Sequence, residues 1–292
     1  MVPVENIDID QWAGPFPSAL QQRALAALES GKVLYFPRLG FDLGAREAGL
    51  LGIDVAKGNR KNITFDPATG RCHGVDLAED EHSRLKSLLK RFSDMSAALV
   101  VGLMPDYAGG LERARTTYRP IEIKGREYSP RKDDRRLHVD AFPSQPTGGR
   151  RILRVFTNIN QAGESRLWQV GEPFEDFAKR FVATLRPPSR FAAWLLAIAG
   201  ITKRKRSAYD QIMLQLHDTA KLDPEYRANA PRCDLSFPPG STWICYTDQV
   251  LHAALAGRFA LEQTFHLSPD LMREPARSPL GVLERLTGRV LA

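Results

Sequence analysis

The chain has 292 residues, of which 43% are hydrophobic and 26% charged, an ordinary globular composition that excludes a chain disordered throughout. Lysine and arginine outnumber the acidic residues by 41 to 34, which gives a net charge of +7. Such an excess favours an anionic partner: nucleic acid, a phosphorylated metabolite or an anionic membrane surface.

Cysteine usage and the N-terminus indicate the compartment. The three cysteines lack Cys-x-x-Cys spacing, which argues against a disulfide framework or a structural zinc site. Residues 1–8 have neither the basic start nor the apolar core of a signal peptide. The longest apolar run, 191–201, falls well short of the roughly 20 residues of a membrane span. We therefore expect a cytoplasmic protein.

Helical periodicity dominates the first 117 residues. Leucines at helical spacing predict a helix over 17–30, and residues 33–36 have the composition of a buried strand. A longer pattern of apolar residues three and four apart predicts a second helix over 76–104. We expect residues 1–117 to form a helical layer that packs against the sheet that follows.

From Tyr118 onward the pattern changes to strands and turns. Alternation and turn residues predict strands at 118–123, 137–142, 151–160 and 165–170, and again at 234–237, 242–246, 250–255 and 259–267. The strands at 151–160 and 165–170 are separated by a short turn, so we expect them to form a hairpin.

Residues 171–233 interrupt these strands with three predicted helices, at 174–185, 190–201 and 209–217. The second helix has an apolar face and is followed by four consecutive basic residues, which is typical of a helix that lies on a membrane surface. The members of that face are Phe191, Trp194, Leu195 and Ile198, and the basic residues are Lys203, Arg204, Lys205 and Arg206. A core helix followed by a charged turn is the simpler interpretation, and the apolar helices could instead form an interface between copies of the chain.

Strands on both sides of a helical insertion predict an α+β fold built on a double-stranded β-helix, the jelly roll of cupin-like proteins. We expect one domain over residues 1–292. The jelly-roll strands lie at 118–170 and 234–268, the helical insertion at 171–233, and a C-terminal tail at 269–292.

One short motif carries the chemistry of the chain. On an extended strand residues i and i+2 project from the same face, so His138 and Asp140 point together. With the distant His252 they provide two imidazoles and one carboxylate, the facial triad that holds a non-haem Fe(II) and leaves positions open for a 2-oxoacid and O2. His-x-Asp also occurs by chance in surface turns and buried structural pairs, but its place in a predicted jelly roll favours a 2-oxoglutarate-dependent Fe(II) dioxygenase.

Basic residues are concentrated around this motif. Residues 111–154 contain twelve lysines and arginines against six acidic residues. A solvated basic face is the simplest explanation of that excess, although its position beside the predicted iron site favours an acidic substrate.

The segments around these residues resemble the bacterial Kdo hydroxylases, which use Fe(II) and 2-oxoglutarate to oxidise the Kdo sugar of the lipopolysaccharide inner core. The similar segments are His138-Val139-Asp140-Ala141-Phe142-Pro143-Ser144, 150–160, 248–255 and 261–267. The resemblance covers the chain from about Tyr118 onward.

It implies 3-hydroxylation of the terminal Kdo of Kdo2-lipid A, with His138, Asp140 and His252 as iron ligands. Fe(II), 2-oxoglutarate and O2 would be required, with ascorbate in support. The substrate is a carboxylated, phosphorylated glycolipid at the inner leaflet, so we expect a cytoplasmic enzyme in peripheral contact with the inner membrane.

The resemblance also implies a cationic partner for the distal carboxylate of 2-oxoglutarate. Related dioxygenases use an Arg or Lys on the strand after the distal histidine, where this chain has Gln263 and His266, or on the strand after His-x-Asp, where it has Arg154. A guanidinium pairs bidentately with a carboxylate, which an ammonium cannot reproduce. Arg154 and Arg258, the latter in a predicted turn after His252, are the expected cosubstrate residues.

The Kdo carboxylate needs a partner as well. Arg119, Arg166 and Trp168 lie in predicted strands that flank the ligand pair, and Arg166 and Trp168 share a strand face. We expect these three residues to form the sugar subsite. A surface cation or a core aromatic is the alternative for each, and the sequence leaves open which arginine pairs with which carboxylate.

Two other functions remain open at this stage. One is a 2-oxoglutarate oxygenase that acts on another anionic sugar or nucleotide. The other is a non-catalytic basic module that binds anionic lipid or nucleic acid, although the basic residues are not interleaved with aromatic residues in any nucleic-acid-binding motif. We assign no function to the remaining histidines, including His217.

The triad makes a direct prediction. His138→Ala or Asp140→Ala should abolish turnover and leave the fold intact, because each change removes one of only three protein ligands. Product formation measures the effect, and circular dichroism measures the fold. Retained turnover in either variant would contradict the iron assignment.

Overall fold

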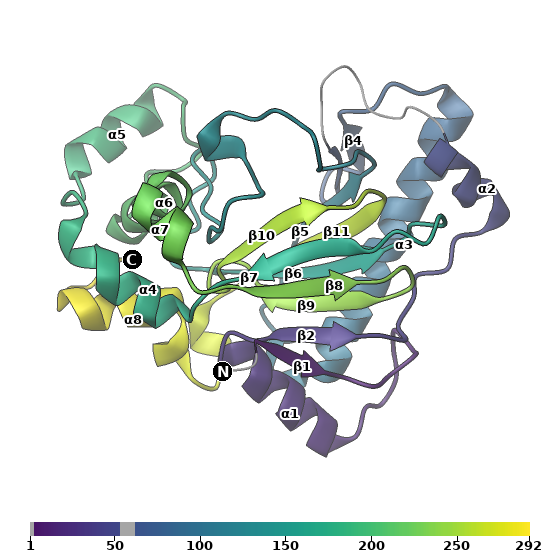
Figure 1. The fold of residues 1–292 in the computed structure, drawn as a ribbon, viewed down its shortest axis with the longest axis horizontal. Coiled ribbons are helices and arrows are strands. Elements are labelled where there is room, and N and C mark those ends of the chain that lie inside the picture. Colours follow the sequence, from purple (N-terminus) through teal and green to yellow (C-terminus); the bar gives the residue numbers. More distant parts are fainter. Residues whose placement is uncertain (1–2, 53–61) are drawn as a thin grey trace.

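The computed structural model describes residues 3–52 and 62–292, and two β-sheets packed face to face form its centre (Figure 1). The larger sheet has eight strands in the order β1-β2-β9-β6-β11-β5-β3-β4, and the smaller has three in the order β10-β7-β8. In the described part of the chain β1 and β2 pair in parallel, and every other pairing of these strands is antiparallel. The predicted double-stranded β-helix is therefore confirmed.

The strands are β1 Val4–Asn6, β2 Val33–Phe36, β3 Ile63–Asp66, β4 Arg71–His73, β5 Glu112–Arg119, β6 Arg151–Asn158, β7 Arg166–Val170, β8 Cys233–Phe237, β9 Thr242–Tyr246, β10 His252–Ala256 and β11 Ala260–Leu267. The α-helices are α1 Ser18–Glu29, α2 Ala45–Ala48, α3 Glu79–Leu103, α4 Phe174–Phe181, α5 Arg190–Ile198, α6 Ala208–Leu222, α7 Pro224–Asn229 and α8 Pro279–Thr287.

Aromatic side chains fill the space between the two sheets. Trp243 of β9 stacks on Phe237 of β8 with ring centroids 4.1 Å apart, and Trp168 of β7 meets Trp243 edge-on at 5.6 Å. All three side chains are buried. Stacked and edge-on pairs fix ring orientation as well as separation, so this cluster holds the small sheet against the large one.

Helices α1 and α3 cover the opposite face of the large sheet, as the sequence predicts for the N-terminal third. Alternation along β6 turns Leu153 and Val155 towards these helices and Phe156 towards the small sheet. The N-terminal third is more than a helical layer, however. It also supplies β1 to β4, which extend both edges of the large sheet, and most of β5.

Three strand predictions are wrong. The strand expected at 118–123 is instead the end of β5, which stops at Arg119. Strands β6 and β7 do not form a hairpin, because β6 belongs to the large sheet and β7 to the small one. The Asn160 side chain shapes the crossing by accepting from the backbone amides of Ala162 and Glu164. Residues 137–142 form no regular strand, and only an isolated bridge joins His138 to His252. Alternation predicts an extended backbone, whereas partners depend on contacts distant in sequence.

The helical insertion lies at one end of the sandwich, where α4, α6, α7 and α8 pack together (Figure 1). Helix α5 differs from its neighbours because its large apolar side chains face solvent. The simpler interpretation of this segment as a core helix is therefore wrong. None of the helices described in residues 3–52 and 62–292 is long and apolar enough to cross a membrane.

A buried cation connects the start of β6 to the loop that precedes β10. The Arg151 side chain is fully buried, with its Nε 2.8 Å from Oδ2 of Asp248 and its guanidinium 3.6 Å from the ring centroid of Tyr246. The Gln249 side chain accepts a further hydrogen bond from Arg151 at 2.6 Å. This network fixes the loop 247–251 to the large sheet.

We expect Asp248→Ala to lower the free energy of unfolding by about 3–5 kcal/mol, because it leaves the buried Arg151 charge without its carboxylate. The matched control is Asp8→Ala, which removes a solvent-exposed pair with Arg38 and should cost less than about 1 kcal/mol. Urea unfolding of both variants measures the difference. Equal decreases in the free energy of unfolding would show that the buried ion pair stabilises the fold no more than the exposed one.

Candidate metal centre

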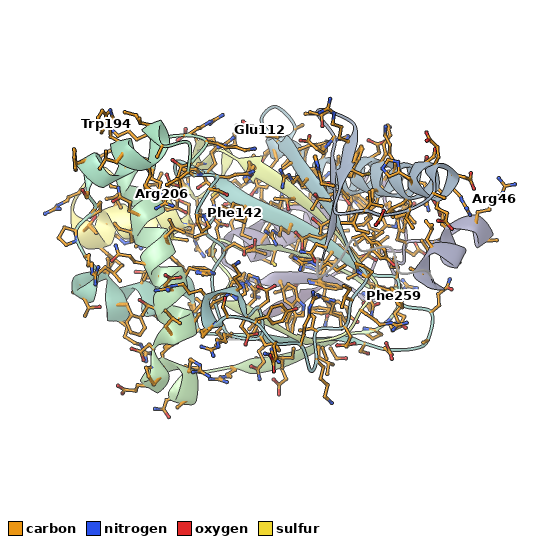
Figure 2. The ribbon with its side chains drawn as sticks, turned by 90° about the horizontal axis from the view of Figure 1, so that it is seen from above. Arg46, Glu112, Phe142, Trp194, Arg206 and Phe259 are labelled. Atoms are coloured by element: carbon orange, nitrogen blue, oxygen red, sulfur yellow. The ribbon has the colours of Figure 1, made fainter. Side chains whose placement is uncertain are left out.

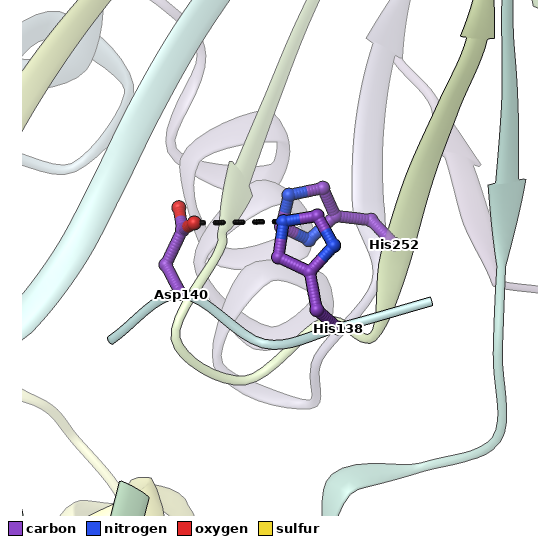
Figure 3. Close-up of side chains that lie close together, drawn as sticks. All are labelled: His138, Asp140 and His252. Atoms are coloured by element: carbon purple, nitrogen blue, oxygen red, sulfur yellow. Dashed lines mark ion pairs between the residues drawn. The ribbon is translucent and has the colours of Figure 1, made fainter. Parts of the chain in front are cut away.

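The structure brings the side chains of His138, Asp140 and His252 close together (Figure 3). Backbone hydrogen bonds hold the segments that carry them. The amide of His138 donates to the carbonyl of His252 at 3.0 Å, and the amide of His252 donates back to the carbonyl of His138 at 2.9 Å. The amide of Asp140 donates to the carbonyl of Thr247 at 2.7 Å. These bonds bring two histidines from distant parts of the chain into direct contact.

The three side chains converge on one point. Each offers a ligand atom, and these atoms all lie within 4.8 Å of one another. Nε2 of His138 is 3.9 Å from Oδ1 of Asp140, and the two imidazole centroids are 4.6 Å apart. The alternation predicted around Asp140 is present: Leu137 and Val139 pack against the helical insertion, whereas His138 and Asp140 face the other way.

Backbone carbonyls fix the tautomer of both histidines. Nδ1 of His138 lies 2.8 Å from the carbonyl oxygen of Arg136, and Nδ1 of His252 lies 2.8 Å from that of Val250. Because a carbonyl oxygen can only accept, each Nδ1 carries the proton and donates it, which leaves the Nε2 lone pair free. This is the form in which imidazole ligates a metal.

Electrostatics favours the same protonation states. Burial lowers the pKa of His138 and of His252 below the ordinary value, so both imidazoles are neutral near pH 7. Burial alone would raise the pKa of Asp140, but the Arg154 guanidinium holds it well below the usual range. Two neutral imidazoles and one carboxylate fit a divalent metal ion, which requires deprotonated ligands.

A chain of buried charges begins at Asp140. Arg154 places Nη2 3.1 Å from Oδ2 of Asp140 and Nη1 3.0 Å from Oε1 of Glu262. The other carboxylate oxygen of Glu262 accepts from Nε and Nη2 of Arg119, at 2.9 and 2.6 Å. Glu262 therefore bridges two of the arginines that the sequence selects, and sequence analysis missed it. Its only signal was that it is the single acidic residue of the strand at 260–267.

Arg166 and Trp168 lie on the inner face of β7, as predicted. The Trp168 ring stacks on the His252 imidazole, with centroids 5.2 Å apart and planes at 23°. The Arg166 side chain is buried and donates to the carbonyl of Gly257 at 3.0 Å, and no described carboxylate forms a salt bridge with it. Burial, followed by repulsion from Arg119, lowers the pKa of Arg166 to about 9. An anionic ligand would stabilise this unpaired charge.

A family model described as 3-deoxy-D-manno-oct-2-ulosonic acid (Kdo) hydroxylase matches residues 11–290. The chain belongs to the Kdo hydroxylase family. No match was found among functionally curated proteins.

Crystal structures of the Kdo hydroxylase KdoO, a non-haem Fe(II) α-ketoglutarate-dependent dioxygenase, are similar over nearly the whole chain. The complex with α-ketoglutarate and Fe(III) is 46% identical, with a TM-score of 0.96, and the match covers 99% of this chain and 97% of that one. The cobalt(II) complex is 47% identical with a TM-score of 0.96, and the complex with succinate and Fe(III) is 47% identical with a TM-score of 0.95. Coverage is the same for both.

Two other residues of this Kdo hydroxylase differ from expectation. Arg258 is exposed in the turn between β10 and β11, and its guanidinium lies 4.1 Å from the Phe259 ring centroid. The structure therefore does not bring this predicted site residue to the cluster. His217 of α6, which had no predicted function, meets the His138 ring edge-on at 5.5 Å. Its Nδ1 lies 3.2 Å from the Asp218 carboxylate. A lone histidine on a helix carries no sequence signal for such a position.

The geometry predicts one high-affinity site for a divalent metal. His252→Ala should weaken Co(II) binding by at least roughly 100-fold, because even the loss of groups that only orient a ligand costs 10- to 100-fold. His73→Ala is the matched control and should retain binding, since His73 is exposed on β4 and lies outside the cluster of three. Calorimetric titration with Co(II) measures both affinities. Equal affinities in the two variants would place the metal elsewhere.

Proposed function

We propose that the protein is an Fe(II)- and 2-oxoglutarate-dependent dioxygenase that hydroxylates C3 of the terminal Kdo of Kdo2-lipid A, acting at the inner leaflet from the cytoplasmic side. The observation that carries the proposal is the cluster of two neutral, carbonyl-oriented histidines and one ionised aspartate. The chain's membership of the Kdo hydroxylase family supports the sugar. The similar KdoO structures that hold α-ketoglutarate (2-oxoglutarate) and Fe(III) support the cofactors.

In this proposal His138, Asp140 and His252 hold the iron. Bound iron, 2-oxoglutarate and O2 together supply an oxidant strong enough for an unactivated C–H bond, which acid–base chemistry cannot break. The protein contributes position and protonation state. The carbonyls of Arg136 and Val250 keep each Nε2 unprotonated, and Arg154 keeps Asp140 ionised.

The buried arginines would hold the two carboxylates. We assign 2-oxoglutarate to Arg154, because its guanidinium already contacts the ligand Asp140 and its Nε has no hydrogen-bond partner. We assign the sugar carboxylate to Arg119 and Arg166, which line one small cavity together with Ala254. Trp168 would hold the His252 ring in place and close the apolar side of the site.

The role of Arg154 makes a sharp prediction. Arg154→Lys should reduce turnover nearly as much as Arg154→Ala, because one ammonium cannot reach both the Asp140 and Glu262 carboxylates and also pair with 2-oxoglutarate. Arg258→Ala is the comparison and should have little effect, since Arg258 lies on the surface. Initial rates at saturating and limiting 2-oxoglutarate measure the loss. A near-normal rate for Arg154→Lys would reject the bidentate role.

Mass spectrometry tests the reaction and its substrate together. Incubation of Kdo2-lipid A with the protein, Fe(II), 2-oxoglutarate, ascorbate and O2 should add one oxygen to the outer Kdo, and omission of 2-oxoglutarate should prevent this. Release of succinate without oxidation of the lipid would retain the oxygenase and reject this substrate. Absence of both, in protein that binds no iron, would overturn the proposal.

A further inference from the structure

Helix α5 exposes a large apolar surface. Seven large apolar side chains are exposed in the described part of the chain, and five belong to α5 and the turn after it: Phe191 at 69%, Trp194 at 49%, Leu195 at 45%, Ile198 at 66% and Ile201 at 58%. Contiguous apolar patches are rare on soluble proteins and usually mark an interaction surface.

Helix α5 turns its apolar face towards solvent, whereas a core helix turns it inward. Phe191, Trp194 and Ile198 follow the spacing of one helix face, and this face points outward, whereas the small Ala193 is the residue that is buried. The rings of Phe191 and Trp194 stack at 6.0 Å, so the outward face is continuous. Figure 2 shows Trp194 at the outer margin of the helical insertion, away from the sheets.

Positive charge is concentrated around this helix. Residues 177–209 contain eight lysines and arginines and no acidic residue. The rest of the chain has 33 basic against 34 acidic residues, so this segment is more basic than the chain as a whole, and residues 111–154, with twelve against six, are the other basic stretch. Four of the eight are consecutive, at 203–206, directly after the apolar face. Of these four, Lys203, Arg204 and Lys205 are exposed.

The basic run also contacts the loop that carries Asp140. The amide of Lys203 donates to the carbonyl of Ser144 at 3.0 Å, and Nη2 of Arg206 donates to the carbonyl of Pro143 at 2.6 Å. Figure 2 places Arg206 and Phe142 between α5 and the sheets. The segment is therefore joined to the loop that leads away from Asp140.

We propose that residues 186–206, the docking segment, bind an anionic lipid surface, with the apolar face of α5 inserted among the acyl chains and the basic run at the headgroups. An apolar face with flanking cations is the arrangement of helices that lie in a membrane interface. The proposal deepens the proposed function, on which it rests for the presence of a lipid-linked substrate, because docking here would present that substrate to the metal centre.

Charge decides between a lipid surface and a second copy of the chain. In a two-fold interface the same patch meets itself, so the exposed cations of two docking segments would face one another. An anionic leaflet neutralises those cations while the apolar side chains leave water. Nucleic acid would pair with the cations but would leave the apolar face exposed.

Trp194 is a built-in reporter of docking. The other three tryptophans, Trp12, Trp168 and Trp243, are at most 8% exposed, so a lipid-dependent fluorescence change arises at Trp194. With vesicles of phosphatidylcholine and phosphatidylglycerol that contain no Kdo, we expect a blue shift and quenching by brominated acyl chains. Both signals should weaken with added salt. Trp194→Phe should remove the signals without preventing vesicle co-sedimentation.

Two variants separate the two contributions. Lys203→Gln/Arg204→Gln/Lys205→Gln should weaken binding to anionic vesicles by roughly 100-fold. The matched control, Arg46→Gln/Arg71→Gln/Lys124→Gln, removes the same charge from exposed positions elsewhere and should change binding less than about threefold. Phe191→Ser/Ile198→Ser should abolish the blue shift, because it removes apolar area that inserts.

Activity shows whether docking serves catalysis. Both docking variants should lose most turnover on substrate embedded in vesicles and retain turnover on substrate dispersed in detergent. Binding of wild-type protein to anionic vesicles without any hydroxylation would overturn the proposed function and leave docking intact. Equal binding to neutral and anionic vesicles, or binding unaffected by the triple Gln variant, would overturn docking on anionic lipid. A shift of Trp194 emission with protein concentration alone would show a self-interface instead.

Discussion

The reciprocal backbone bridge between His138 and His252 is the interaction on which the candidate site depends. It joins the segment before β6 to the first residue of β10, and both side chains then project towards Asp140. Each of these two segments is held in place by other parts of the fold. The small sheet holds β10, and the Thr247 carbonyl holds the amide of Asp140. A shift of one residue in the segment 137–142 would turn His138 and Asp140 to the opposite side.

Buried charge is the second constraint on the site. Arg154, Glu262 and Arg119 form a linked series that starts at Asp140, and Arg151 and Asp248 form another beneath the loop before His252. Burial of such groups is costly unless each finds a partner. Arg166 is the exception, since within residues 3–52 and 62–292 its guanidinium donates only to the carbonyl of Gly257. Unpaired buried charge of this kind is expected where an anionic ligand completes the site.

The helical insertion gives the site its outer boundary. Helix α6 places His217 against His138, and the run 203–206 bonds to the loop that follows Asp140. The docking segment is therefore joined by hydrogen bonds to the loop that follows a candidate metal ligand. An enzyme that acts on a sugar held at a membrane needs this proximity, because the lipid cannot leave the leaflet without exposing its chains to water.

The sequence by itself determined what depends on local periodicity. Alternation placed His138 with Asp140 and Arg166 with Trp168, and three-to-four spacing located α1, α3 and the insertion. Only the tertiary structure decided the partners: that β6 and β7 lie in different sheets, that Glu262 bridges two arginines, that Arg258 stays outside the cluster, and that the large side chains of α5 face outward. A period fixes which side chains share a face, but the surroundings of that face depend on residues far away in the chain.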